Sequence, residues 1–183
     1  MALITLAEAK DQLDLDSDDH DTELTRYINA LTAPIERYVG PVENREVAEV
    51  IEGRSPTLCL SSIPAVSIAS IVPVLSTGQA ITVNEVHLDG ATGIVRRLNG
   101  GTFRGGLWTV TYTAGRTTVP DTIKLAALIL LQHLWRTQYG AARGGSGGGD
   151  DYDVNEPIVG WGYAIPNRVL QLLEPYKVPP AAA

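Results

Sequence analysis

The sequence has little of several residue types that build common sites: it contains one cysteine, one methionine and one phenylalanine, and 6% of its 183 residues are aromatic. A lone cysteine forms no internal disulfide and no cysteine-based zinc site. We expect Cys59, between Leu58 and Leu60, to be a small buried hydrophobic residue. The longest apolar run, 125–131, is shorter than a membrane span, and residues 1–10 do not resemble a signal peptide. These features favour a soluble protein made in a cytoplasm.

Motifs of catalysis and of cofactor binding are also missing. The glycines at 144–149 precede no Lys-Ser/Thr pair of a phosphate-binding loop, and the three histidines follow no metal-ligand spacing. The aspartates from Asp14 match the start of a calcium loop, but Asp19 replaces its glycine and Thr25 its glutamate. An acidic turn before a helix explains them better. We predict no metal, no cofactor and no enzymatic activity; a hydrolase of unrecognised type is an alternative without a visible nucleophile–base pair.

The net charge of −7 is distributed unevenly along the chain. Residues 1–52 contain 13 acidic and 4 basic residues, 53–149 contain 3 and 8, and 150–183 contain 5 and 2. An acidic beginning, a basic middle and an acidic end are typical of head-to-tail self-association or of a charged partner. A chance scatter of charges over a solvated surface explains the same numbers equally well.

Helical periodicity appears at both ends of the sequence. Thr5 and Glu8 match a capping box, which predicts a short helix to about Leu13. Apolar residues recur at steps of three and four up to Val39, which predicts a second helix from about Asp19 or Asp21. Pro34 lies inside this pattern and predicts a kink or a break. A third helix is predicted over 120–139, where the apolar residues of 125–131 lie on all sides. A short fourth helix is predicted over 166–174, after the glycine-rich linker 144–149.

The middle of the chain is rich in valine, isoleucine and threonine, which predicts strands. Turn sequences at 89–93 and 99–101 predict two hairpin turns. We therefore predict an α+β fold, in which a small helical bundle (residues 1–45 and 116–142) has an inserted antiparallel β-rich subdomain (46–115) and is followed by a linker and C-terminal docking tail (143–183). The predicted strands are 46–52, 57–62, 66–74, 81–88, 94–98 and 107–113.

Four segments together resemble the tailed-phage head–tail connector (adaptor) family, in its longer form with a β-rich insertion. They are the opening helix at 3–10, the acidic turn and second helix at 18–40, the last strand and helix start at 110–124, and the closing segment at 165–176. Pro34 and the glycine-rich linker depart from the family pattern. The strands between 46 and 98 match only in general character.

The resemblance implies a structural protein of the virion neck, assembled in the host cytoplasm and not an enzyme. Such adaptors form a ring of about twelve copies, as a repeated heterologous contact does when it closes. The implied partners are the portal protein, a stopper or tail-terminator protein, other copies of the chain, and genomic DNA that passes without sequence recognition. A channel lined by acidic residues lets DNA slide, and the acidic helical ends are our candidate for that lining.

Two groups of residues are candidates for contacts with these partners. The tail is the candidate for docking on the portal, although its apolar residues have an equally good explanation in packing against their own domain. The basic residues and two residues of the third helix are candidates for subunit contacts. The tail residues are Trp161, Tyr163, Ile165, Val169, Leu172, Leu173 and Tyr176, and the subunit-contact residues are Arg96, Arg97, Arg104, His133 and Trp135.

Two further functions stay open at this stage. One is a stopper or tail-completion protein of the same neck, against which the third helix and the closing tail helix argue. The other is a DNA-binding packaging factor, but the three arginines at 96, 97 and 104 are a small basic footprint for binding nucleic acid.

Overall fold

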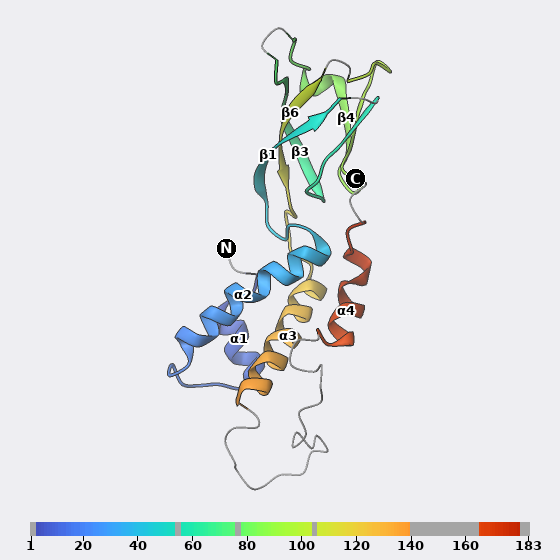
Figure 1. The fold of residues 1–183 in the computed structure, drawn as a ribbon. Helices are drawn as coiled ribbons and strands as arrows, with labels where there is room; N and C mark the ends of the chain where they lie inside the picture. Colours follow the sequence, from blue (N-terminus) through green and yellow to red (C-terminus); the bar gives the residue numbers. More distant parts are fainter. Residues whose placement is uncertain (1–2, 54–55, 76–77, 104–105, 140–164, 180–183) are drawn as a thin grey trace. The chain divides into compact units, whose positions relative to one another are not determined.

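The computed structural model describes residues 3–53, 56–75, 78–103, 106–139 and 165–179, which form helices and strands of an α+β protein (Figure 1). They divide into two compact units. The helical unit comprises residues 1–35 and 120–175, and the β unit comprises residues 36–119 and 176–183. Among the described residues, no helix is both long and apolar enough to cross a membrane.

The helical unit begins with the predicted capping box. The Thr5 hydroxyl accepts a hydrogen bond from the Glu8 amide at 3.2 Å, and the Glu8 carboxylate accepts one from the Thr5 amide at 2.7 Å. Because both orphan amides are satisfied, helix α1 starts at Leu6 and extends to Leu13. Asp14 ends it in the left-handed conformation, with φ of 57°.

Helix α2 spans Asp21–Val39 and continues through Pro34. A break at this proline was therefore a wrong expectation. Pro34 removes the amide that would pair with the Ala30 carbonyl, and both residues lie on the exposed side of the helix, where this loss costs less than it would in the core. The predicted apolar stripe is buried throughout: it consists of Leu24, Ile28, Leu31, Ile35 and Val39.

Helix α3 (Asp121–Tyr139) lies at the centre of the helical unit, with α1 and α4 (Asn167–Leu173) packed against it. The turn η3 (Glu174–Tyr176) follows α4. The helix bounds agree with the sequence prediction, but α3 is not buried on all sides. Leu125 is 43% exposed and His133 is half-buried, because the neighbouring helices cover only part of its circumference.

The β unit contains two three-stranded antiparallel sheets, with strand orders β1-β6-β3 and β2-β5-β4. All six predicted strands exist. The fourth starts later than predicted, because Ile81 forms an isolated bridge and a 3-10 turn, η1 (Val83–Glu85), precedes it. The strands are β1 (Arg45–Glu52), β2 (Thr57–Cys59), β3 (Ala65–Pro73), β4 (Val86–Asp89), β5 (Ile94–Arg97) and β6 (Leu107–Ala114).

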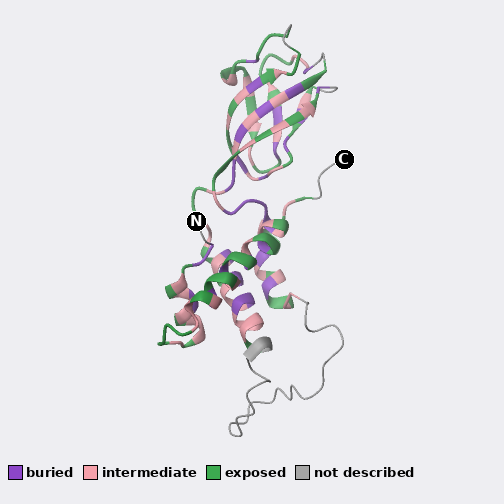
Figure 2. Cartoon of the chain, turned by 60° about the vertical axis from the view of Figure 1, so that its left-hand side comes forward, coloured by how far each residue is buried: buried purple, intermediate pink, exposed green. Residues whose placement is uncertain are grey.

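The core of the β unit is formed by side chains from both sheets, and Figure 2 shows buried residues alternating with exposed ones along the strands. Strand β6 alternates most regularly, as predicted, with Trp108, Val110, Tyr112 and Ala114 directed inward. Because both sheets turn one face to this shared core, their other faces point away from each other. The β unit is thus a small sandwich with two separate outer faces.

Three local predictions in the β unit have different outcomes. The turn at 89–93 closes the β4–β5 hairpin, with a hydrogen bond from the Gly93 amide to the Asp89 carbonyl at 2.8 Å. The turn at 99–101 is not a hairpin, because it connects β5 to β6 and these strands belong to different sheets. Cys59 is exposed, contrary to expectation, because only Leu58 of the three-residue strand β2 faces the core.

Candidate interaction surfaces

The outer face of the β1-β6-β3 sheet carries exposed apolar side chains in register. Val50 on β1 lies opposite Thr109 on β6, which in turn lies opposite Val72 on β3. Val50 is 57% exposed, and Leu107 at the end of β6 is 48% exposed. The charged residues of this face are Glu46 and Glu52 on strand β1. The valine face, as we call Val50, Thr109, Val72 and Leu107, is apolar with an acidic edge.

The outer face of the β2-β5-β4 sheet is different in charge. Arg96 is exposed at the centre of this sheet, between Thr57 on β2 and His87 on β4. The next row joins Cys59, Ile94 and Asp89. Leu98, just after β5, is 66% exposed. We call Arg96, His87, Ile94, Cys59 and Leu98 the arginine face.

Two of the arginines proposed as subunit contacts, Arg96 and Arg97, lie on opposite sides of the β2-β5-β4 sheet. Arg97 alternates with Arg96 along β5 and is half-buried, with its guanidinium 3.8 Å from the Glu85 carboxylate. Arg104 lies outside the described residues. Because neighbouring residues of a strand point to opposite sides of the sheet, Arg96 and Arg97 do not share one face.

The two candidate contacts of α3 lie in the helical unit. Trp135 packs edge-to-face on His20 at 5.3 Å and on Tyr27 at 6.2 Å between ring centroids. This arrangement half-buries Trp135, and His133 is half-buried as well. Aromatic pairs of this geometry stabilise the packing of helices.

The tail residues fall into two groups. In the helical unit, Val169 and Leu173 are buried, while Ile165 and Leu172 are half-buried. Since α4 packs against α3, the buried pair holds the tail helix on its own chain. The remaining aromatic residues of the predicted docking segment, Trp161 and Tyr163, lie outside the described residues.

Tyr176 belongs to the β unit, where it contacts Arg116. The Arg116 guanidinium lies 5.8 Å from the centroid of the Tyr176 ring. It donates hydrogen bonds to the carbonyls of Val39 at 2.8 Å and Pro41 at 3.0 Å, which satisfies carbonyl groups at the end of α2. Burial lowers the pKa of Arg116 from its ordinary value, and the group stays charged at neutral pH.

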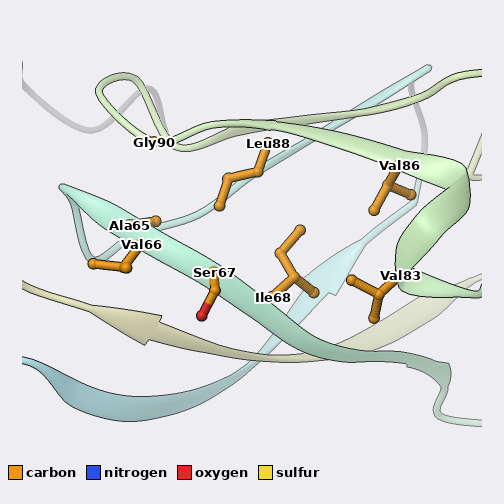
Figure 3. Close-up of a pocket in the computed structure, with 8 residues that line it drawn as sticks. All are labelled: Ala65, Val66, Ser67, Ile68, Val83, Val86, Leu88 and Gly90. Carbon is orange, nitrogen blue, oxygen red and sulfur yellow. The ribbon is translucent and has the colours of Figure 1, made fainter.

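A groove on the open side of the sandwich lies between β3 and β4 (Figure 3). Its lining is mainly apolar, with Ala65 and Ile68 on the β3 side and Val83, Val86 and Leu88 on the other. Among the described residues, no acidic, basic or histidine side chain lines it. The groove therefore suits apolar contact and supplies no group for acid–base catalysis.

The acidic turn between α1 and α2 is held by one lysine. Lys10 lies 2.6 Å from the Asp18 carboxylate and 2.9 Å from that of Asp21. The hydrogen bond from Lys10 lowers the pKa of Asp18. Over the described part of the chain, no group of three histidine, cysteine or acidic residues is placed to hold a metal ion. The remaining acids of the turn, which point to solvent, are Asp14, Asp16 and Asp19.

Three chains of known structure share this fold. A chain in the neck of an empty gene transfer agent (GTA) particle, computed with C6 symmetry, has a TM-score of 0.65 and 18% identity, covering 98% of this chain and 92% of that chain. A chain in the virion of the native particle has a TM-score of 0.61 and 19% identity, covering 98% and 92%. A chain in the native neck, computed with C12 symmetry, has a TM-score of 0.62 and 20% identity, covering 97% and 90%.

The family is decided by a match over almost the whole sequence. No curated protein matches the chain. Residues 2–178 match the family model described as head completion protein. This match confirms the relationship expected from the four resembling segments, and the chain belongs to the head completion protein family.

Proposed function

We propose that this chain is a structural adaptor in the neck of a tailed phage or a phage-like particle. It forms a ring that joins the portal vertex to the stopper or tail. The observation that carries the proposal is the family match over residues 2–178. The fold shared with chains of a GTA neck, whose structures have C6 and C12 symmetry, supports the same role. The role is structural and requires no catalytic group.

A ring of about twelve copies needs one heterologous contact that is repeated around an axis. Within each copy, residues 1–45 and 116–142 serve as the connector core, and 46–115 as the β-rich insertion. Residues 143–183 serve as the docking tail. The two compact units separate the helices from the strands in a similar way, but they divide the tail, with residues up to 175 in the helical unit and 176–183 in the β unit.

The tail is the proposed contact with the portal. Val169 and Leu173 anchor α4 on its own chain, which leaves the half-buried Ile165 and Leu172 for the partner. Trp161 and Tyr163, which lie outside the described residues, are proposed for the same contact. Aromatic residues contribute a large share of the binding energy in many interfaces.

The exposed acids of the turn before α2 are the proposed lining of the DNA channel. Asp14, Asp16 and Asp19 are exposed, whereas Asp18 is paired with Lys10. Carboxylates repel DNA phosphates, so a lining of this kind lets the genome slide without sticking. The DNA passes without recognition of its sequence.

Mass measurements of the full-length chain, alone and mixed with its portal ring, test the proposal. We expect a complex whose mass adds a whole ring of this chain to the portal. Replacing Trp161 and Tyr163 together by alanine should lower the affinity for the portal at least about thirtyfold, because this is the effect of removing an aromatic hot spot from an interface. Tyr152→Ala is the matched control in the same segment. If the wild-type chain does not bind the portal alone but binds a complex of the portal with another adaptor, the chain is a stopper. This result refutes the adaptor function.

A further inference from the structure

We propose that the valine face of one copy binds the arginine face of the next copy, so that the β unit carries a subunit contact of the ring. This inference rests on the proposed function, since it needs a ring. It adds the two surfaces that meet, their orientation and their chemistry. The partner of each surface is a second copy of the same chain.

The valine face has the composition of an interface core. Its centre is a row of uncharged side chains, Val50, Thr109 and Val72, at adjacent positions of three paired strands. Exposed apolar side chains that form a continuous group on a regular sheet mark an interaction surface more often than single exposed residues do. A flat face of this kind matches another flat sheet face, as in the packing of two β-sheets.

The arginine face is complementary in both polarity and charge. Leu98 and Ile94 offer apolar contact, and Arg96 is its exposed cation. The valine face carries acidic residues, Glu46 and Glu52, along its β1 edge. A contact in which the centre of the arginine face lies over the β1 edge of the valine face buries apolar side chains of both faces and brings Arg96 beside the acidic residues of that edge.

One residue of the arginine face has the opposite charge, but its carboxylate is already engaged. Asp89 accepts a hydrogen bond from the Thr92 hydroxyl at 2.7 Å and one from the Ala91 amide at 3.2 Å. These bonds hold the carboxylate in the β4–β5 turn at the end of the sheet. These bonds lower the pKa of Asp89, so its carboxylate stays ionised at the end of the sheet, while the charge at the centre of the face is that of Arg96.

The orientation of the two faces is that of a ring contact. Both sheets share one core, so their outer faces point in opposite directions from the same sandwich. A contact between two different faces is heterologous, and its repetition builds a ring or a filament instead of a closed pair. Contact between two valine faces would bring Glu46 and Glu52 of one copy near the same glutamates of the other, and these like charges would repel each other.

Cysteine crosslinking tests the contact directly, because the native Cys59 is the single cysteine of the chain and lies exposed on the arginine face. Val50→Cys, Thr109→Cys and Val72→Cys each place one partner thiol along the row of the valine face. A disulfide requires Cα atoms about 5.5–6 Å apart, so it reports adjacency at the contact. We expect oxidation of the portal-bound ring to give a ladder of covalent multimers with at least one of the three variants.

Two controls make the ladder specific. Adding Cys59→Ser to the crosslinking variant abolishes multimers larger than a pair. Ala91→Cys, exposed in the turn beside the arginine face, gives no ladder. A ladder of equal strength from Ala91→Cys means that thiols meet by random collision, and this result overturns the inference.

Charge reversal is the independent measurement. Arg96→Glu, or Glu46→Lys with Glu52→Lys, weakens ring assembly about three- to tenfold at low salt, and combining the three substitutions restores it. If wild-type rings form on the portal but neither the ladder nor the charge rescue is seen, the contact is refuted and the adaptor function stands. If the wild-type chain forms no ring on the portal, the proposed function fails and the contact fails with it.

Discussion

Removing one hydroxyl group from the core of the β unit tests how its strands are held together. The Tyr112 side chain is fully buried, and its hydroxyl donates a hydrogen bond to the Glu49 carboxylate at 3.0 Å. The same hydroxyl accepts one from the Ser62 amide at 3.0 Å. Tyr112→Phe keeps the ring in its place but removes both hydrogen bonds. The substitution therefore isolates the polar contribution of one side chain.

The expected cost follows from the groups that lose a partner. The Ser62 amide, which is only partly exposed, loses its acceptor, and an unsatisfied group of this kind costs about 1–3 kcal/mol. Glu49 loses less, because the amide and the hydroxyl of Ser61 still donate to its carboxylate. We expect the free energy of unfolding to fall by about 1–3 kcal/mol.

The same residue predicts a pH dependence at the alkaline end. Burial is the main cause that raises the pKa of Tyr112, and the nearby Glu49 carboxylate acts in the same direction. A phenol with a raised pKa in the folded state stabilises the fold below its unfolded pKa of about 10, and this contribution is lost as the pH rises further. The wild-type chain should lose stability above about pH 10 more steeply than Tyr112→Phe.

Urea unfolding, followed by tryptophan fluorescence, measures the change in the free energy of unfolding. Hydrogen exchange of the Ser62 amide measures whether this amide has lost its hydrogen bond. Thr111→Val is the matched control, because its hydroxyl lies on the outer face of the same strand, and its effect should stay within about 0.5 kcal/mol. If Tyr112→Phe changes stability no more than this control, or if exchange at Ser62 is unaltered, the hydrogen bonds do not stabilise the β unit.

Three further substitutions probe other parts of the chain. Thr5→Ala removes the capping box and should cost about 1 kcal/mol in thermal unfolding followed by circular dichroism. In denaturant titrations, Leu131→Ala in the helical core should cost about 2–5 kcal/mol, whereas Leu125→Ala, at an exposed position of the same helix, should cost less than about 1 kcal/mol. A Cβ atom at Gly40 would lie within bonding distance of the Ile63 carbonyl oxygen, so Gly40→Ala should destabilise the protein strongly. Gly100 has a similar positive φ but open space around it, so the control substitution Gly100→Ala should cost only about 1–2 kcal/mol.

The helices were predictable because their signals are local. A capping box and an apolar stripe at helical spacing each act within a few residues. These signals placed α1, α2 and α3 within a residue or two of their bounds. Pro34 predicted a kink or a break, and the break is wrong: the cost of a proline depends on whether the carbonyl one turn earlier is exposed, and a single sequence does not show which side of the helix is exposed.

The positions of the strands were predictable from the sequence, but their pairing into sheets was not. Strands β5 and β6 are neighbours in sequence, with a glycine-rich turn between them, and these features favoured a hairpin. In the structure, β5 pairs with β2 and β4 in one sheet, and β6 pairs with β1 and β3 in the other. Pairing depends on which face of each strand the core covers, and this is decided by contacts between residues that lie far apart in the chain.

The same limit explains why the charge pattern of the sequence did not identify a surface. The acidic segment 1–52 ends with strand β1, and the basic segment 53–149 includes β5. Strand order places β1 at the edge of one sheet and β5 at the centre of the other, so the two charges come to lie on opposite outer faces of one sandwich. Alternation along β5 then separates Arg96, on the outer face, from Arg97, which pairs with Glu85. Charges of opposite sign on the two outer faces are what the proposed head-to-tail contact between copies requires.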